Sequence, residues 1–436
     1  MNPNVKPAYF HELMRACQGA AGKKPPLNVL LLCSPSAGSI TSWVPIIYFL
    51  SLKYDIRIHL VFGKRSIVDQ WSINPLNQKI IDFFVVSYMW KVSDSVWARF
   101  LKPQYEPSDP KILTLSWANV ISGLFKKSTT FVTLNVIKKL NIDIMLYDVY
   151  EETKGYLKDL FKFVKDIPKA SISHGLNPYN PDWDPKGVDD FRPPNCIEKT
   201  LVILKYSDHV DWTDRYFPAV RKAVVGWPTC SRRWLKVVRH LTEKKIDEEY
   251  ILLCSRGSND KFFSRSEKKH LLTQLSMLCR RDGYKLIIKP HPKEMRNGRP
   301  MEYGLIVDAL GHDAEGVIWE ICESDLGVLA ENAKMVVSVV SASVVYQTFS
   351  INRRILLTNR SGGVGPALKR NFDEGSIASI AFSELAEDLL RSSLDFLCSE
   401  YEKFGGDELS SCSVDKVINI IEQHMRHGSQ SREVYE

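Results

Sequence analysis

Short apolar runs recur along the chain, and each is followed by a turn and then by a longer stretch with the apolar spacing of a helix. In the first half the runs cover 28–33, 56–62, 142–147 and 170–173, and in the second half they cover 250–254, 285–288, 317–319, 335–340 and 354–357. Such runs predict buried strands, because a strand that is covered on both faces is apolar throughout. Strands that alternate with helices predict parallel sheets, so the expected fold class is α/β.

A charged stretch at 242–249 separates the two series of strands. A length of 436 residues suggests two to three domains at about 150 residues each. We therefore predict two Rossmann-like domains that face a central cleft, one over 28–240 and one over 249–382. Residues 1–27 are predicted to be an N-terminal extension, and 383–436 to be mostly helical and able to pack back across the boundary.

The net charge limits the classes of partner. The chain carries a formal charge of +7, and its basic residues are spread out rather than gathered into one arm. A dedicated nucleic-acid-binding protein is not expected from this distribution. Anionic substrates or an acidic membrane face remain compatible with it.

The cysteines and the apolar segments indicate a cellular location. Nine cysteines with no CxxC pair argue for a reducing compartment, against a disulfide framework and against a structural zinc site. Residues 1–27 lack the apolar core of a signal peptide, and no segment offers about 18 uninterrupted apolar residues. The expected location is cytoplasmic, or peripheral on the cytoplasmic face of the inner membrane.

The tetrapeptide Lys289-Pro290-His291-Pro292 directly follows the apolar run at 285–288. In α/β sheets, ligands bind beyond the carboxyl ends of the strands. The two prolines fix φ and remove backbone donors, so they would hold His291 on a stiff turn beside Lys289. The alternative is a rigid loop with no functional role. An anionic ligand such as a phosphate suits the first interpretation.

A second candidate site follows the apolar run at 335–340. Ser338, Ser341 and Ser343 lie where this run passes into a predicted helix. Free N–H groups at a helix N-terminus, together with hydroxyl donors, form an anion site. Ordinary helix capping by the serines is the alternative.

The order of four segments resembles a known family. These are His174-Gly175, Val224-Val225-Gly226-Trp227-Pro228, Lys289-Pro290-His291-Pro292 and the turn at 338–343. The chain resembles bacterial GT-B glycosyltransferases that build surface polysaccharides, in particular capsule-type Kdo and sialic acid transferases and the related CDP-glycerol polyol-phosphate transferases. The resemblance covers roughly residues 28–360.

The resemblance implies a nucleotide-sugar donor, linked to CMP, on the C-terminal domain, and a glycan acceptor, free or lipid-linked, on the N-terminal domain. It places the cytidine nucleotide and its phosphate against His291 with Pro292 and against Ser341 and Ser343, although Ala342 splits the serine pair here. The family also has a carboxylate-carboxylate-glycine motif. In this chain Thr153 and Lys154 separate Glu151-Glu152 from Gly155.

Transfer chemistry requires two sets of residues. An acceptor hydroxyl needs a base, for which Asp148, Glu151, Glu152 and His174 are candidates. The leaving phosphate needs fixed donors, for which Arg256 joins the groups already named. Each base candidate has a structural alternative, since Asp148 can cap a helix, the glutamates can form a solvated first turn and His174 can bond internally.

No metal and no cofactor are expected. The turn after the first apolar run is not GxGxxG, so a dinucleotide fingerprint is absent. Asp182 and Asp184 could hold a divalent cation, but they lie in a proline-rich segment away from any predicted strand end.

Three functions follow as hypotheses. The first is transfer of Kdo or a sialic-type sugar from a CMP-activated donor to a glycan hydroxyl during assembly of capsule or lipopolysaccharide. The second is transfer of a polyol phosphate from CDP-glycerol or CDP-ribitol. The third is a non-catalytic component of the polysaccharide machinery, which would bind no donor.

Overall fold

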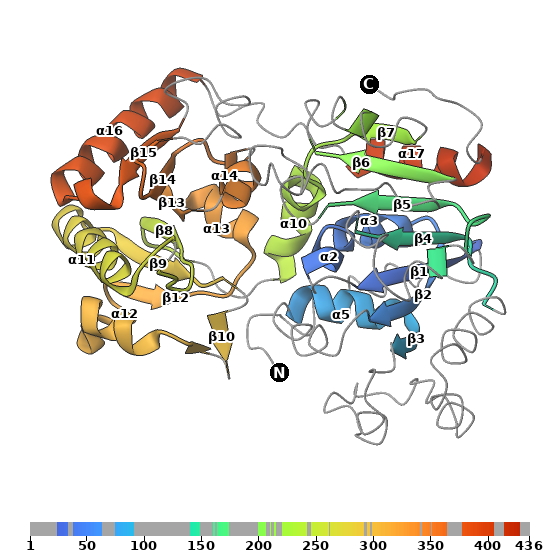
Figure 1. The fold of residues 1–436 in the computed structure, drawn as a ribbon, viewed down its shortest axis with the longest axis horizontal. Coiled ribbons are helices and arrows are strands. Elements are labelled where there is room, and N and C mark those ends of the chain that lie inside the picture. The colour runs from blue at the N-terminus through green and yellow to red at the C-terminus, as the bar shows by residue number, and fades with distance from the viewer. Residues whose placement is uncertain are drawn as a thin grey trace. The chain divides into compact units, whose positions relative to one another are not determined.

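The computed structural model describes residues 24–33, 38–62, 75–90, 140–148, 160–161, 164–173, 199–205, 210, 213–214, 220–241, 246–260, 262–291, 294–296, 299–340, 342–349, 351–363, 377–404 and 414–427. Contacts divide the chain into two compact units, each built around its own sheet (Figure 1). The N-terminal unit contains the elements before residue 232 and the last helix, α17 (Val414–His427). The C-terminal unit contains the elements from α10 (Arg232–Leu241) to α16 (Glu387–Phe404).

The N-terminal unit has a seven-stranded parallel sheet in the order β3-β2-β1-β4-β5-β6-β7. Its strands are β1 (Pro26–Cys33), β2 (Asp55–Phe62), β3 (Val85–Trp90), β4 (Ile144–Tyr147), β5 (Lys169–Ile172), β6 (Thr200–Leu204) and β7 (Arg221–Val224). The chain adds strands on one side of β1 and then restarts with β4 on its other side. This makes the carboxyl ends of β1 and β4 a topological switch point, where such sheets bind ligands.

The described helices of the N-terminal unit are α2 (Gly38–Thr41), α3 (Val44–Ser51), α5 (Pro75–Phe84) and α17, with a 3-10 turn at η4 (Pro228–Cys230). Every residue of α3 is buried, because α5 and α17 both contact it beside β2. Lys53, just after α3, pairs with Glu422 of α17 at 3.1 Å. The last helix of the chain therefore packs on the helical layer of the first unit.

The C-terminal unit has a six-stranded sheet in the order β12-β9-β8-β13-β14-β15, and all its strands are parallel. These are β8 (Tyr250–Cys254), β9 (Lys285–Lys289), β12 (Trp319–Ile321), β13 (Met335–Val339), β14 (Ile355–Asn359) and β15 (Ala378–Ala381). Numbered along the chain, the order is 3-2-1-4-5-6, the strand order of the Rossmann fold. Its switch point lies between β8 and β13.

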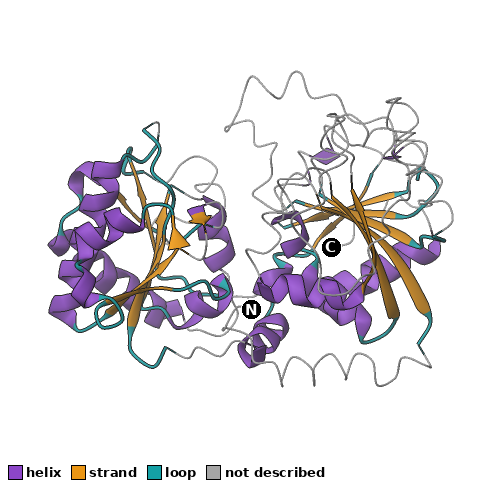
Figure 2. Cartoon of the chain, turned by 90° about the horizontal axis from the view of Figure 1, so that it is seen from below, coloured by secondary structure: helices purple, strands orange, loops and turns teal. Residues whose placement is uncertain are grey.

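Helices cover both faces of this sheet (Figure 2). On one face α11 (Arg265–Asp282) contacts α12 (Tyr303–Leu310) and α16, and on the other α13 (Leu326–Asn332) contacts α10 and α14 (Ala342–Phe349). Shorter pieces complete the unit: the β10 (Met295–Arg296) and β11 (Arg299–Pro300) hairpin and the 3-10 turns η6 (His312–Ala314) and η7 (Phe382–Glu384). A capping box of Ser264 and Glu267 begins α11, and Gly283 ends it in the left-handed conformation at φ 76°.

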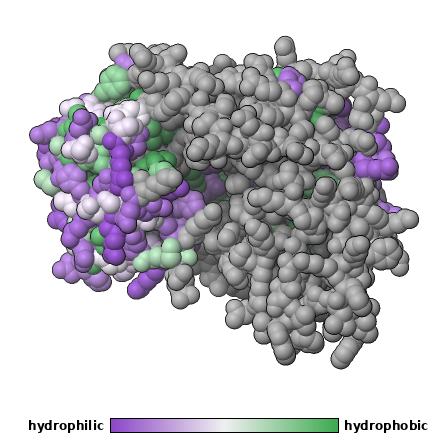
Figure 3. All heavy atoms as spheres, in the orientation of Figure 1, coloured by the Kyte–Doolittle hydropathy of each residue, from purple (hydrophilic) through white to green (hydrophobic). Residues whose placement is uncertain are grey.

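The expected fold class, α/β with two Rossmann-like domains, is confirmed. Several strands were not predicted from the sequence, namely β3, β6, β10, β11 and β15. Strand β12 begins two residues later than the predicted 317–319. Within the part of the chain that the structure describes, no helix is both long and apolar enough to cross a membrane. On the face seen in Figure 3, the C-terminal unit shows mainly hydrophilic side chains with scattered hydrophobic ones.

Candidate functional site

The register of the C-terminal sheet brings several predicted site residues to one edge. Cys254 ends β8, and it lies level with Lys289 of β9 on one side and with Ser338 of β13 on the other. The turns that follow these three strands therefore leave the same edge of one sheet, at its switch point. Arg256 and His291 each lie two residues beyond this row.

The turn after β13 has an unusual backbone. Val340 still donates its N–H to Thr358 O of β14 at 2.9 Å, and its own φ is 51°. A β-branched residue is rarely left-handed, so this conformation carries strain. The strained residue lies between β13 and α14, where the chain turns sharply away from the sheet. Strain of this kind is concentrated at binding and catalytic turns.

Lys289 holds an adjacent turn together. Its ammonium donates to Ser324 O at 2.6 Å and to Glu323 O at 3.4 Å, both in the turn between β12 and α13. Two of the three ammonium donors are thus already engaged by main-chain carbonyls. These bonds stabilise the turn that leads to α13. The phosphate ligand expected for this lysine from the sequence stays a prediction.

His291 is exposed, so its side chain is accessible to a ligand. Its carbonyl accepts the N–H of Glu294 at 2.8 Å. Pro292 lies outside the described residues. The stiffness expected of the turn after β9 stays a prediction.

Arg256 is an exposed cation at this edge. Its guanidinium makes no hydrogen bond or ion pair with any residue that the structure describes, whereas its carbonyl accepts a hydrogen bond from Lys268 at 3.0 Å. The main chain at Arg256 is thus fixed and the charged group is open to solvent. An exposed guanidinium on a fixed main chain suits a phosphate or carboxylate.

The predicted serines are placed differently from one another. Ser338 is completely buried within β13 (0% exposed), so its hydroxyl lies inside the sheet rather than at the edge. Ser343 lies in the first turn of α14, and its side chain is not among those described. Ser341 lies outside the described residues.

A second set of predicted residues belongs to the N-terminal unit. Asp148 directly follows β4 and is fully buried, and the indole of Trp43 donates to the carbonyl of Tyr147 at 3.2 Å, which fixes the main chain beside it. Glu151, Glu152 and His174 lie outside the described residues, as do Asp182 and Asp184. Among the residues that are described, no group of three or more His, Cys, Asp or Glu side chains is arranged to hold a metal ion.

Lys205 follows β6 at the same edge as Asp148 and was not among the residues predicted from the sequence. Its ammonium lies 3.5 Å from the ring centroid of Trp227, and only 5% of the residue is exposed. Burial lowers the pKa of Lys205 to about 7, although the charges of Asp148 and Cys230 act to raise it. The position of Lys205 directly after an apolar run could have indicated it as a candidate, but the run that forms β6 was not predicted to be a strand.

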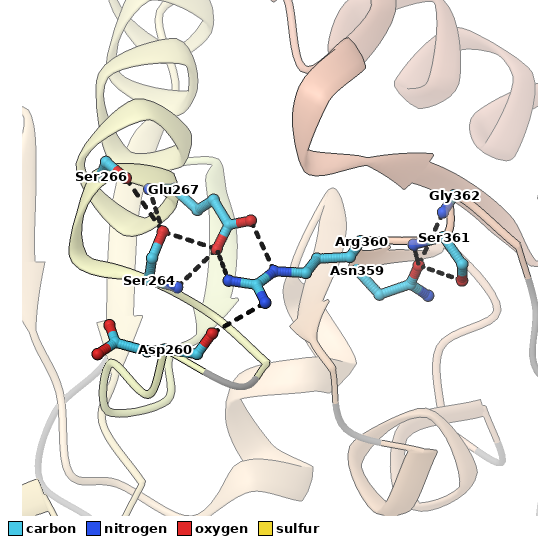
Figure 4. A network of polar contacts seen from close by, with 8 residues as sticks. All are labelled: Asp260, Ser264, Ser266, Glu267, Asn359, Arg360, Ser361 and Gly362. Carbon is cyan, nitrogen blue, oxygen red and sulfur yellow. Dashed lines mark hydrogen bonds and ion pairs between the residues drawn. The ribbon is translucent and has the colours of Figure 1, made fainter.

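A network of polar contacts connects the segment 260–267 to the end of β14 in the C-terminal unit (Figure 4). Arg360, after β14, donates to both carboxylate oxygens of Glu267 and, at 2.9 Å, to Asp260 O. Asn359 accepts the N–H groups of Ser361 and Gly362 through its side-chain oxygen. The loop between β8 and α11 is thereby attached to the end of β14.

Comparison with known proteins extends these observations to the fold family. No family model and no curated protein matches the sequence. Solved structures do match. UDP-GlcNAc 2-epimerase from Neisseria meningitidis bound to UDP-GlcNAc has 11% identity and a TM-score of 0.52, covering 92% of this chain and 99% of its own. S. aureus MnaA bound to UDP has 12% identity and a TM-score of 0.53, covering 94% and 100%.

A third match is UDP-GlcNAc 2-epimerase from Methanocaldococcus jannaschii, with 12% identity and a TM-score of 0.50, covering 91% of this chain and 99% of its own. These proteins have the GT-B fold, and identities this low establish only the fold. They give no support for the capsule-type Kdo and sialic acid subgroup in particular. The comparison therefore places the chain among proteins with a GT-B fold.

Proposed function

We propose that this chain is a glycosyltransferase of GT-B architecture that transfers a sugar from a nucleotide-activated donor to a glycan hydroxyl. The observation that carries the proposal is Arg256, whose exposed guanidinium has no partner among the described residues and lies at the switch point of the C-terminal sheet. Switch points of such sheets are where nucleotides bind. The other cations described along this edge, Lys268, Lys289 and Arg360, are engaged by protein groups.

The donor phosphate would lie over the turns after β8, β9 and β13. Arg256 and His291 would then meet the negative charge that develops on the leaving phosphate. The first turn of α14, with Ser343, offers N–H groups to the same anion. Lys289 would act through the turn that it holds.

The acceptor would lie on the N-terminal unit. Asp148, at the switch point of that sheet, is the described candidate for the base, and Glu151, Glu152 and His174 remain candidates from the sequence. Lys205 contributes a nearby amine of lowered pKa that can exchange a proton at neutral pH. The acceptor proposed is a glycan, and a lipid-linked form would bring the protein to the inner membrane face.

The nucleobase of the donor can be cytosine or uracil. The resemblance seen in the sequence favours cytidine, either as a CMP-linked Kdo or sialic-type sugar or as CDP-glycerol. Two of the matched structures hold uridine nucleotides, UDP and UDP-GlcNAc. Calorimetric titration with CMP, CDP, UDP and ADP separates these possibilities. Binding of none of them would contradict the proposed function and favour a non-catalytic role.

A second candidate function is epimerisation at C2 of UDP-GlcNAc. The matched structures named above favour it, because two of them are enzymes of that name. Proton NMR of UDP-GlcNAc incubated with the protein and no acceptor would distinguish the two reactions. Formation of a C2 epimer without acceptor would establish epimerisation. A donor that stays unchanged without acceptor and is consumed when a glycan acceptor is added would establish transfer.

We also propose that transfer needs no divalent metal, because Arg256, His291 and the start of α14 can together meet the charge of the leaving phosphate. Turnover should then continue in excess EDTA, and the double variant Asp182→Asn, Asp184→Asn should be nearly silent. Loss of activity in EDTA that magnesium or manganese restores would contradict this proposal.

A further inference from the structure

We propose that the buried residues Lys268 and Glu294 and the half-buried Glu302 form a cluster that sets the conformation of the two turns carrying Arg256 and His291. We call these three residues the positioning cluster. The inference rests on the proposed function for its ligand and on the contacts below for its geometry. None of the three residues would touch the substrate.

Lys268, in the first turns of α11, is the centre of the cluster. Its side chain is only 2% exposed, and its ammonium donates to Arg256 O at 3.0 Å and to Glu302 Oε2 at 2.9 Å. The same ammonium lies 3.7 Å from Glu294 Oε2. A buried ammonium is costly unless its donors are satisfied, so these partners fix the position of the ammonium.

Glu302 attaches the next part of the turn. Its Oε2 accepts the N–H of Ser258 at 3.1 Å and the Ser258 hydroxyl at 3.0 Å, in addition to the bond from Lys268. Burial acts to raise the pKa of Glu302, but the hydrogen bonds from Lys268 and Ser258 outweigh it and hold that pKa below its usual value. The carboxylate is therefore ionised at neutral pH and remains a strong acceptor for the turn.

Glu294 links the cluster to the second turn. Its N–H donates to His291 O at 2.8 Å, and its carboxylate lies near Lys268. A Cβ added to Gly257 would approach Glu294 Cγ to 3.3 Å, so the side chain lies directly against the Arg256-Gly257-Ser258 turn. Glu294 thus contacts both turns, one through its main chain and one through its side chain.

The three residues come from three separate segments: Lys268 and Glu302 bind the turn of Arg256, and Glu294 contacts both turns. The carbonyl of Arg256, both donors of Ser258 and the carbonyl of His291 are bound to members of the cluster. Hydrogen-bonded groups in such surroundings, here Lys268 and Glu302, have few alternative arrangements. Turns that are fixed before a ligand arrives lose little conformational entropy when it binds. Lys268 is therefore a positioning residue that acts on ligands through Arg256.

The test begins with Lys268→Met, which keeps the apolar stem and removes the ammonium. We expect its affinity for the best-binding nucleotide among CMP, CDP, UDP and ADP to fall by about 10- to 100-fold, because small displacements of binding groups carry large penalties. Lys268→Arg should recover part of the loss. Lys269→Met, at the exposed neighbouring position, is the matched control and should bind normally.

A double-mutant cycle separates positioning from general destabilisation. If Lys268 acts through Arg256, Lys268→Met should cause little further loss of affinity in an Arg256→Gln background. An equal loss in both backgrounds, or normal affinity in Lys268→Met, would overturn the inference. Glu302→Gln preserves the shape of the side chain and provides a second variant if Lys268→Met folds poorly.

Hydrogen exchange gives a readout that does not depend on nucleotide. We expect faster amide exchange over residues 255–260 in Lys268→Met and Glu302→Gln than in Lys269→Met, with unchanged exchange in β13. Unchanged exchange at 255–260 would overturn the inference even if nucleotide binds. If the wild-type protein bound no nucleotide, the proposed function would fail, and faster exchange would still support the positioning of the turn.

Discussion

Arg360 forms a bidentate ion pair with Glu267, in which Arg360 Nε lies 2.9 Å from Glu267 Oε1 and Nη2 lies 3.0 Å from Oε2. Glu267 is also the third residue of α11, and with Ser264 it forms the capping box that begins this helix. One carboxylate thus serves both the start of a helix and the end of β14. Since Arg360 also holds the carbonyl of Asp260, the loop after β8 is anchored at its far end, while Lys268 anchors it near Arg256.

This pair predicts a specific response to acid. The hydrogen bond from Arg360 is the main reason that the pKa of Glu267 is lowered to about 2. A lowered pKa in the folded state stabilises the protein above the unfolded value of about 4.5, and this contribution disappears as the pH falls toward 2. Glu267→Gln should therefore be less stable than wild type at pH 6, and the difference in melting temperature should vanish near pH 2. A difference that is independent of pH would contradict the assignment.

Arg256→Gln should weaken nucleotide binding and lower turnover while the melting temperature stays close to that of wild type. The side chain is exposed and has no described partner, so its loss removes a ligand contact and little else. Loss of one donor to a developing oxyanion typically lowers the rate by about 10²–10³-fold. Arg391→Gln on the surface of α16 is a suitable control. Normal binding by Arg256→Gln would remove the central support of the proposed function.

His291→Ala should remove most activity without unfolding the chain. His291 is exposed at the end of the β9 turn, and a donor to the leaving group acts mainly in the transition state. The expected loss is about 10²–10³-fold in turnover, with nucleotide affinity changed much less. Near-normal turnover would show that the proline-flanked turn is only a stiff loop.

The base should be found in the N-terminal unit. Single alanine variants of Asp148, Glu151, Glu152 and His174, assayed for product while donor binding is measured separately, should identify one that loses turnover and keeps donor affinity. Asp148→Asn is the additional variant for this buried position, because it keeps the shape of the side chain. Full activity in every variant would place the acceptor elsewhere.

Lys205 predicts a change in stability at alkaline pH. The folded protein releases the proton of Lys205 above about pH 7, whereas the unfolded chain keeps it up to about 10.5. The unfolded state therefore binds more protons in this window, and stability due to this group rises with pH. Urea unfolding at pH 7 to 10 should show this rise in wild type and in Lys53→Met, an exposed control, and not in Lys205→Met. Parallel curves for all three proteins would contradict the lowered pKa.

The sequence alone determined the class of fold and the edges where chemistry is expected. Apolar runs of four to eight residues identify buried strands because strand burial is a local property of composition and length. The alternation with helices then implies parallel sheets, and the residues just after each run must lie at a carboxyl edge. Arg256, His291 and Asp148 were found in this way, and each does follow a strand of the structure.

Only the tertiary structure decided which of these residues meet. In the 3-2-1-4-5-6 order, β9 and β13 flank β8. The apolar pattern of a buried strand is the same whichever strands lie beside it, so this pattern does not reveal the strand order. Ser338 proved to be fully buried and Lys289 to be bound by carbonyls of a turn 34 and 35 residues away. Lys268 and Glu302, also 34 residues apart, form one cluster. Such pairings arise from strand order and helix packing, which are long-range, so no local pattern of residues encodes them.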